Sequence, residues 1–254
     1  MIDLQDKRVV ITGAGGGVGR ALCRAFGAAG ATLVGCDADR SQVPETCETA
    51  HGFDLRDDDA IAASAERILE DGVPDIVISN AGWTRAETLG DVTPATYDDE
   101  MARNVNGAAK FCMALLPPMR RTAGDRSFVF IASVNALSHF GNPAYAAAKA
   151  AGLAWMRAIA TEAGRDGVRA NAVVPASIRT AAWDHRLKTD PTVLDRVSRL
   201  YPLGRLVTPE EVANTALFLA SPLASGITGV ALNVDAGLMA GNLPFVDAIT
   251  GQKD

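Results

Sequence analysis

A glycine-rich segment joins a short apolar run to a helix-like segment near the start of the chain. The apolar run at residues 8–11 predicts a buried strand, and the spacing at 17–30 predicts a helix. Between them stands Thr12-Gly13-Ala14-Gly15-Gly16-Gly17-Val18-Gly19. Glycines let the backbone approach a pyrophosphate, and a helix N-terminus supplies free N–H groups. The order of strand, glycine loop and helix therefore favours a nucleotide-binding α/β fold over an ordinary turn.

The same alternation of strand-like and helix-like segments continues along the chain. Further strands are predicted at 31–36, 52–55, 76–79, 127–132, 168–174 and 230–234, and helices at 57–71, 94–121, 143–164 and 209–220. Strands that alternate with helices pair in parallel through right-handed crossovers. The sequence thus predicts a single doubly wound Rossmann-type α/β domain over residues 1–254, with a mostly parallel seven-stranded sheet and helices on both faces.

An acidic residue closes the second predicted strand. Asp37 stands about twenty positions beyond the glycines, where a carboxylate suits the ribose 2′ and 3′ hydroxyls and repels a 2′-phosphate. The glycine loop contains no Lys or Arg, and Arg40 is flanked by Asp37 and Asp39. NAD is therefore the expected cofactor, in preference to NADP.

Tyr145 and Lys149 lie four residues apart in the helix predicted at 143–164, so their side chains share one face. A nearby ammonium favours the phenolate and lowers the pKa of a phenol from its usual value of about 10. Such a phenol can accept the proton of an alcohol during oxidation and return it in the reverse reaction. The Y-x-x-x-K spacing is common by chance, so its meaning depends on the motifs around it.

Ser133 follows the strand predicted at 127–132, and Asn80-Ala81-Gly82 follows the strand at 76–79. Both therefore lie at the carboxyl edge of the sheet, where ligands bind in such folds. With these motifs, the chain resembles the common form of the short-chain dehydrogenase/reductase family, whose length is close to its 254 residues. The family's T-G-x-x-x-G-x-G, N-A-G, N-x-x-G, serine and Y-x-x-x-K all occur here in order.

The resemblance implies a role for each matched residue. Tyr145 would transfer the proton, Lys149 would lower its pKa and hold the nicotinamide ribose, and Ser133 would bind the substrate oxygen. Asn104, the asparagine of N-x-x-G, would hold a water that links Lys149 to solvent. Helical spacing alone does not separate Asn104 from Asn106, and the match to the motif chooses Asn104.

The resemblance also implies that Asp54 and Leu55 flank the adenine, and that Ile178 and Thr180 contact the nicotinamide. The residues expected to bind the cofactor are Gly13, Gly15, Gly17, Val18, Gly19, Asp37, Asp54, Leu55, Asn80, Ala81, Gly82, Tyr145, Lys149, Pro175, Ile178 and Thr180. Two positions depart from the family pattern: Pro175-Ala176 replaces Pro-Gly, and Asp235-Ala236-Gly237 replaces Asp-Gly-Gly. Neither change removes a catalytic group.

Substrate contacts are expected in the loops around this edge of the sheet. The candidate residues are Trp83, Arg85, Asn135, His139, Asn142, Trp183, His185 and Arg186. Residues 177–203 are polar and weakly periodic, and the resemblance implies that they form a substrate lid. The polar character of the candidates favours a sugar, polyol or hydroxy acid as substrate.

The net charge of −6 disfavours nucleic acid and anionic membranes as partners, because both require a basic patch. We expect no membrane span and no signal peptide, because long apolar stretches and a cleavage pattern are absent. No metal site is expected from the scattered cysteines and histidines, and free thiols indicate a reducing cytoplasm. In the resembling family, long helices such as 143–164 pack across subunit contacts, so we expect a homo-oligomer, dimer or tetramer.

The leading hypothesis is an NAD(H)-dependent oxidoreductase that interconverts a secondary alcohol and a carbonyl. The alternative substrate class is a 3-oxoacyl thioester, although the usual NADP preference of such reductases conflicts with Asp37. A hypothesis of another class is a non-catalytic cofactor-binding scaffold. The intact set of Asn104, Ser133, Tyr145 and Lys149 counts against that hypothesis, because a scaffold is free to lose these residues.

Overall fold

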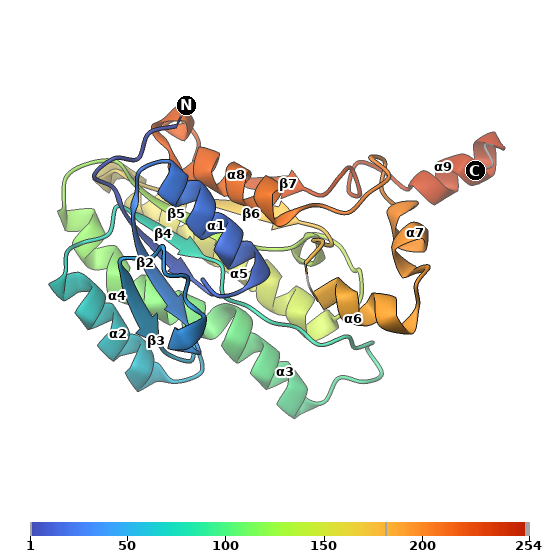
Figure 1. The fold of residues 1–254 in the computed structure, drawn as a ribbon, viewed down its shortest axis with the longest axis horizontal. Helices are drawn as coiled ribbons and strands as arrows, with labels where there is room; N and C mark the ends of the chain where they lie inside the picture. The colour runs from blue at the N-terminus through green and yellow to red at the C-terminus, as the bar shows by residue number, and fades with distance from the viewer. Residues whose placement is uncertain (1, 181, 252–254) are drawn as a thin grey trace.

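The computed structural model describes residues 2–180 and 182–251, which form a seven-stranded sheet with helices on both faces (Figure 1). The strand order is β3-β2-β1-β4-β5-β6-β7, and every neighbouring pair is parallel. The strands are β1 (Arg8–Thr12), β2 (Thr32–Asp37), β3 (Thr49–Gly52), β4 (Ile76–Ser79), β5 (Arg126–Ile131), β6 (Val168–Pro175) and β7 (Ala231–Val234). The predicted Rossmann-type fold is confirmed, and its sheet is parallel throughout.

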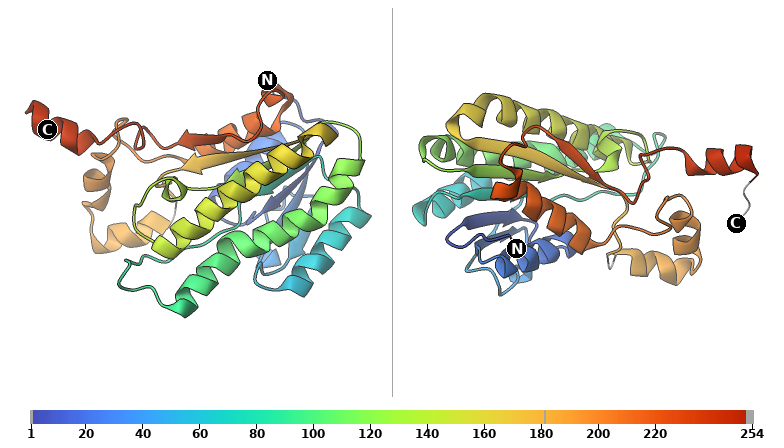
Figure 2. Two further views of the ribbon diagram at one scale, coloured as in Figure 1. Left: turned by 180° about the vertical axis from the view of Figure 1, so that it is seen from behind. Right: turned by 90° about the horizontal axis from the view of Figure 1, so that it is seen from above.

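The helices form a layer on each face of the sheet (Figures 1 and 2). One layer contains α1 (Gly17–Ala28) and α8 (Pro209–Ala220), which pack on each other. The other contains α2 (Asp58–Glu70), α4 (Gly107–Arg121) and α5 (Pro143–Ala163). The remaining helices are α3 (Pro94–Met101), α6 (Ala182–Thr189), α7 (Val193–Ser198) and α9 (Leu243–Thr250). In both figures α9 projects away from the sheet.

Burial on both faces explains why the strand sequences are nearly continuous apolar runs. Every residue of β6 is buried, as is every residue of β5. Parallel pairing keeps the carboxyl ends level: Thr12 pairs with Cys36, and Ser79 pairs with Phe130. The loops that follow β1, β2, β4 and β5 therefore open at one edge of the sheet, which is the edge predicted to bind ligands.

Capping residues fix where the helices begin. The Asp57 side chain accepts the Ala60 N–H at 3.0 Å, so this acidic cluster opens α2 as expected. Thr208 and Glu211 form a reciprocal capping box at the start of α8, with Pro209 as its first residue. These local signals account for the close agreement of both helix starts with the predicted ones.

The third predicted strand is wrong in its position. The strand lies at Thr49–Gly52 instead of 52–55, and Phe53, Asp54 and Leu55 belong to the loop that follows. β3 is an edge strand whose residues are only partly buried, so its sequence carries little apolar pattern. Within the segment 177–203, where only an irregular lid was expected, α6 and α7 are helical.

The long helix predicted at 94–121 contains a wider, π-helical turn at Ala102–Asn106, between α3 and α4. Here the Asn104 side chain donates to the Glu100 carbonyl at 3.0 Å and competes for a backbone acceptor. Such π turns occur frequently at functional sites. Just beyond it, a Cβ on Gly107 would lie 2.0 Å from the Leu55 carbonyl oxygen, so only glycine allows this approach of α4 to the loop after β3.

Candidate active site

A cavity of about 790 Å³ runs along the carboxyl edge of the sheet, from the glycine loop to α5. Every residue predicted from the sequence to bind the cofactor lines this cavity, from Gly13 to Thr180. Further lining residues were not among the predicted cofactor-binding set, although some belong to motifs that the sequence analysis names and most flank predicted ones: Thr12, Gly16, Cys36, Ala38, Gln42, Phe53, Thr84, Arg103, Ile131, Ala132 and Ala176. The topology thus brings together segments that are far apart in the sequence.

The glycine loop leaves no room for side chains. Gly13 has a φ of +65°, and a Cβ there would lie 2.8 Å from the Ala81 Cα. A Cβ on Gly19 would lie 2.0 Å from the Gly13 carbonyl oxygen. Asn80 braces the loop from the end of β4, because its Nδ2 donates to the Thr12 and Gly13 carbonyls. A bare loop before a helix N-terminus fits a pyrophosphate, so the residues present fit a dinucleotide.

Asp37 lines the cavity beside the glycine loop, where the sequence predicts a carboxylate. Its Oδ2 accepts the Gly15 N–H at 2.9 Å. Arg40 turns away and donates to the Ala50 carbonyl on β3. The sequence analysis did not weigh Arg20, whose side chain donates to the Gly15 and Gln42 carbonyls and so places a cation near the same loop. Asp37 remains the carboxylate that lines the cavity beside the glycine loop.

Ser133, Tyr145 and Lys149 meet at the other end of the cavity. Ser133 is buried at the end of β5, and its hydrogen bond to Tyr145 lowers the pKa of that phenol. Burial has the larger effect and raises the pKa of Tyr145 to about 12. The Lys149 Nζ lies 5.6 Å from the centre of the Tyr145 ring and donates to the Ile131 carbonyl at 2.9 Å.

Lys149 therefore does not have the effect on Tyr145 that the sequence analysis expected. Burial lowers the pKa of Lys149 to about 8, so the ammonium keeps its charge at neutral pH and loses it in mildly alkaline solution. In the arrangement described, the pKa of Tyr145 is raised, with burial as the main cause and the Glu100 charge as a smaller one. The phenol is consequently protonated at neutral pH and can donate a proton.

Asn104 is buried in the π turn, whereas Asn106 is exposed. Its Oδ1 accepts the Trp83 N–H at 3.1 Å, and its Nδ2 donates to the Trp83 carbonyl at 2.8 Å. A Cβ on Gly82 would lie 2.9 Å from the Asn104 Oδ1 and 3.3 Å from the Lys149 Nζ. Asn104 is thus the asparagine that the fold places beside Lys149, as the family motif implied.

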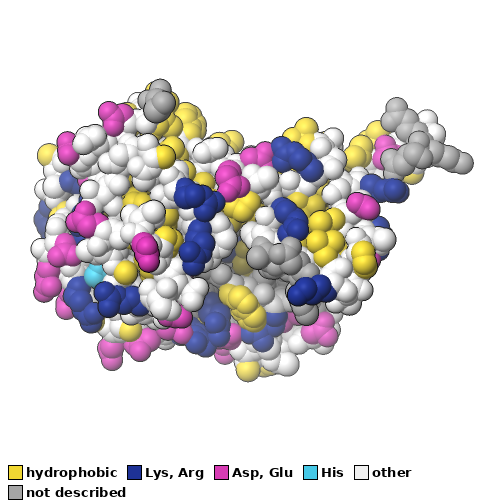
Figure 3. All heavy atoms as spheres, in the orientation of Figure 1, with side chains coloured by type: hydrophobic (Ala, Val, Ile, Leu, Met, Phe, Trp, Pro, Cys, Tyr) yellow, Lys and Arg dark blue, Asp and Glu magenta, His cyan; other side chains and the backbone are white. Residues whose placement is uncertain are grey.

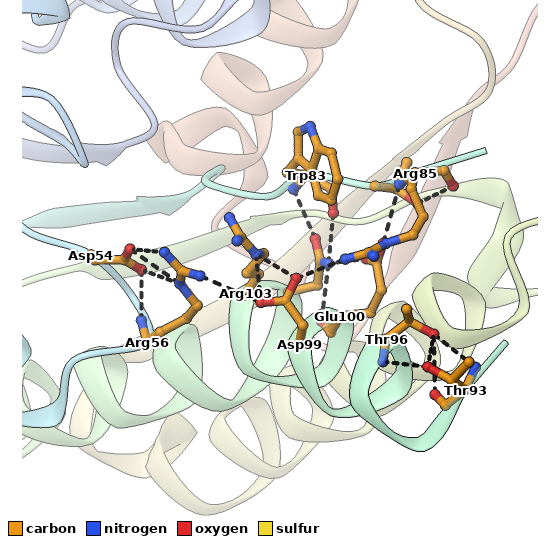
Figure 4. A network of polar contacts seen from close by, with 11 residues as sticks. Asp54, Arg56, Trp83, Arg85, Thr93, Thr96, Asp99, Glu100 and Arg103 are labelled. Atoms are coloured by element: carbon orange, nitrogen blue, oxygen red, sulfur yellow. Dashed lines mark hydrogen bonds and ion pairs between the residues drawn. The ribbon is translucent and has the colours of Figure 1, made fainter. Parts of the chain in front are cut away.

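A network of charged side chains connects Asp54, which lines the cavity, to Glu100, which binds Asn104 (Figure 4). Asp54 pairs with Arg56, which also approaches Asp99 at 3.5 Å. Asp99 accepts from Arg103 at 2.9 Å and from Arg85 at 2.8 Å. The guanidinium groups of these two arginines each lie 5.3 Å from the centre of the Trp83 ring.

Glu100 completes this network and is wholly buried. The sequence analysis missed it. Its position four residues before Asn104 was the available signal, since residues at that spacing share a helix face.

The substrate candidates are dispersed. Trp83 lines the cavity and is half-exposed, whereas Arg85 points to the acidic pair on α3. The Asn135 Nδ2 donates to the Gly141 carbonyl within its own loop, whereas the Asn142 Oδ1 accepts the Glu87 N–H and so ties this loop to the one after β4. His139 is exposed, and Trp183 packs in the core. The side chains of His185 and Arg186 lie outside the described parts of the structure.

Across residues 2–180 and 182–251, no helix combines the length and apolar character that a membrane crossing requires. The same residues contain no group of three His, Cys, Asp or Glu side chains placed to hold a metal ion. On the face shown in Figure 3, basic and acidic side chains are interspersed.

Comparison with known proteins identifies the family. The family model described as enoyl-(acyl carrier protein) reductase matches residues 13–239. An uncharacterized oxidoreductase of Schizosaccharomyces pombe is 36% identical over 253 residues, which cover 99% of this chain and 98% of the relative. The human (3R)-3-hydroxyacyl-CoA dehydrogenase is 31% identical, with 92% of this chain and 96% of the relative covered.

Two solved structures share the fold over nearly their full lengths. A short-chain dehydrogenase/reductase from Burkholderia thailandensis superimposes with a TM-score of 0.88 at 36% identity, covering 97% of this chain and 98% of the other. The ligand-free aldohexose dehydrogenase of Thermoplasma acidophilum gives a TM-score of 0.85 at 28% identity, with 94% and 96% covered. The matches span the glycine loop, the helix asparagine and the Tyr145 site together, and the chain belongs to the short-chain dehydrogenase/reductase family of oxidoreductases.

Proposed function

We propose that the protein is an NAD-dependent oxidoreductase that interconverts a secondary alcohol and a carbonyl, with Tyr145 as the general acid and base. One observation carries the proposal: a glycine-rich loop and the polar Ser133, Tyr145 and Lys149 side chains line the same cavity. Interconversion of an alcohol and a carbonyl with a nicotinamide cofactor requires that the protein bind the dinucleotide and move a proton.

In the oxidising direction a bound NAD would take up the hydride that leaves the alcohol carbon. Tyr145 Oη takes the hydroxyl proton, while Ser133 Oγ holds the substrate oxygen. In the reducing direction Tyr145 donates the proton to the carbonyl oxygen. Because burial raises the pKa of Tyr145 to about 12, the phenol is ready to donate at neutral pH, and alkaline conditions favour the oxidising direction.

The proposed cofactor is NAD because a carboxylate, Asp37, lines the cavity beside the glycine loop. A carboxylate accepts hydrogen bonds from ribose hydroxyls and repels a 2′-phosphate. Arg20 is the nearby cation that would soften this preference, but its guanidinium is already engaged by two loop carbonyls.

The proposed substrate is a small polar molecule such as a sugar, polyol or hydroxy acid. Thr84 and Ser133 supply polar groups to the cavity wall, and the similar Thermoplasma structure is that of an aldohexose dehydrogenase. The alternative, a 3-oxoacyl or 3-hydroxyacyl thioester, is supported by the human relative. We further propose that residues 177–203, with α6 and α7, act as the substrate lid, because Thr180 lines the cavity at their base.

A screen of NADH formation over sugars, polyols, hydroxy acids and 3-hydroxyacyl thioesters tests the function. We expect turnover with at least one polar alcohol and a preference for NAD over NADP. Turnover with acyl thioesters alone would replace the substrate assignment by the alternative. NADH binding without turnover in any class would favour a non-catalytic scaffold.

A further inference from the structure

Glu100 is a charged residue buried without any exposed side-chain surface, in the last turn of α3. Its Oε2 accepts from the Asn104 Nδ2 at 2.7 Å, and its Oε1 accepts the Arg85 N–H at 3.1 Å. The Arg85 Nε lies 3.5 Å from the same Oε1. A buried carboxylate is costly unless it is paired and hydrogen-bonded, and here the Asn104 amide and Arg85 supply those partners.

The carboxylate has a geometric effect on the Asn104 amide. Because both oxygens of Glu100 only accept, the Asn104 Nδ2 must face Glu100 and its Oδ1 must face the other way. That Oδ1 accepts the Trp83 N–H and lies next to Gly82. A glutamine at position 100 has only one acceptor oxygen for two donors, the Asn104 Nδ2 and the Arg85 N–H. Its own NH2 group would therefore face one of these donors.

The carboxylate also has an electrostatic effect on the reacting pair. Burial lowers the pKa of Lys149, and the negative charge of Glu100 opposes that change. The same charge raises the pKa of Tyr145. The Lys149 Nζ and the Asn104 Oδ1 both lie close to Gly82, since a Cβ there would be 3.3 Å from the one and 2.9 Å from the other, and the Asn104 amide is hydrogen-bonded to Glu100.

We infer that Glu100 is a positioning residue of the active site: its carboxylate orients the Asn104 amide and keeps Lys149 in its charged form. The inference rests on the proposed function, in which Lys149 is the cation beside Tyr145. Glu100 does not line the cavity, so it acts through Asn104 and through its charge rather than by touching substrate or cofactor.

Several charged groups surround Glu100. On its own helix stand Asp99 and, one turn on, Arg103. Arg85 faces it from the loop after β4. The groups on α5 that respond to its charge are Tyr145 and Lys149. Asp99 binds Arg85 and Arg103, whereas the Asn104 Nδ2 is hydrogen-bonded to Glu100, so Asp99 provides a matched control for the loss of a neighbouring carboxylate.

The test compares Glu100→Gln with Asp99→Asn in the full-length protein. Lysine carrying an isotope label reports protonation of Lys149 by nuclear magnetic resonance, and Lys149→Met identifies its signal. We expect Glu100→Gln to lower the midpoint of the Lys149 titration by about one pH unit, the shift for a charge lost within about 10 Å at an effective dielectric constant of about 20. Asp99→Asn should leave that midpoint in place.

NADH binding, followed by fluorescence, should change by less than about threefold in Glu100→Gln, because Glu100 lies outside the cavity. An unchanged Lys149 midpoint in Glu100→Gln would overturn the inference, as would an equal shift in Asp99→Asn. If Glu100→Gln does not fold, Glu100→Leu removes the same charge and is assessed in the same way. Failure of both variants to fold would make Glu100 a structural residue and would equally overturn the inference.

The Lys149 titration requires no substrate, so it fails or succeeds independently of the proposed reaction. Full turnover by Tyr145→Phe would refute the proposed function while leaving the Lys149 midpoint interpretable. Loss of turnover in Tyr145→Phe, together with a wild-type midpoint in Glu100→Gln, would refute the inference alone.

Discussion

Asp37→Asn isolates the charge of the carboxylate that lines the cavity beside the glycine loop. An asparagine oxygen can still accept the Gly15 N–H that Asp37 Oδ2 accepts at 2.9 Å, so the loop should keep its shape. Replacing a charged acceptor by a neutral one weakens a ribose hydrogen bond by about 1 kcal/mol. Removing the charge also removes the repulsion between this carboxylate and the 2′-phosphate of NADPH. That repulsion amounts to about 3 kcal/mol per unit charge, for a separation of about 5 Å and an effective dielectric constant of about 20. The preference for NAD should therefore narrow by about 4 kcal/mol, on the order of a thousandfold.

The ratio of the dissociation constants of NADH and NADPH measures this change directly. Trp83 lines the same cavity, so quenching of tryptophan fluorescence can follow both titrations. Asp39→Asn is the matched control, because Asp39 binds Ser41 in the same loop and does not line the cavity. A ratio that stays within about threefold of the wild-type value in Asp37→Asn would refute the assignment of cofactor preference to this carboxylate.

Three further predictions concern the reacting phenol, the buried cations and the stability of the fold. Tyr145→Phe should lower turnover by at least about a thousandfold with NADH affinity retained, because it removes only the proton-transferring oxygen; steady-state kinetics and NADH titration measure both quantities. Because the pKa of Lys149 is lowered to about 8, the unfolded chain binds a proton that the folded protein lacks above that pH, so stability rises with pH there. Relative to Lys149→Met, the wild-type free energy of unfolding should rise by about 2 kcal/mol between about pH 8 and pH 9.5, measured by denaturant titration; parallel pH dependences would contradict this. Arg169 is buried and donates to the Leu219, Ala220 and Ser221 carbonyls at the end of α8. Arg169→Met should therefore lower the free energy of unfolding by about 3 kcal/mol in the same denaturation experiment. Arg120→Met is the control, and because Arg120 forms an exposed ion pair with Asp166, it should lower the free energy of unfolding by less than about 1 kcal/mol.

Elements whose signals are local were predictable from the sequence. The strand at Ile76–Ser79 and the helix at Pro209–Ala220 have the predicted bounds, because an apolar run and a capping box each define their own limits. The cavity lining was predictable for a different reason: parallel strands end at one edge, so residues directly after several strands must converge there. The catalytic set follows from the family motifs, and its placement in one cavity agrees with that assignment.

Features that depend on side-chain direction were not predictable in this way. The partners of Arg20, Asn135 and Asn142 are carbonyls or N–H groups of loops whose shapes the sequence pattern does not encode. The pKa of Tyr145 depends on how deeply its phenol is buried, which the spacing to Lys149 does not reveal. The π turn at Asn104 also has no periodic signature, since a single wider turn shifts the helix face by less than the pattern resolves.

The contact between Gly107 and Leu55 has a consequence for how the cavity can open. With a Cβ excluded at 2.0 Å from the Leu55 carbonyl, α4 and the loop after β3 are seated directly on each other. The helix that follows Asn104 and the loop that contains Asp54 therefore touch directly, and we expect them to move together rather than part during cofactor exchange. We expect the larger movement at the opposite rim, where the proposed lid with α6 and α7 follows Thr180. Mutations in the loop at Asp54 should accordingly affect the site at Asn104 as well, while mutations in the proposed lid should alter the rates of cofactor and substrate entry and release.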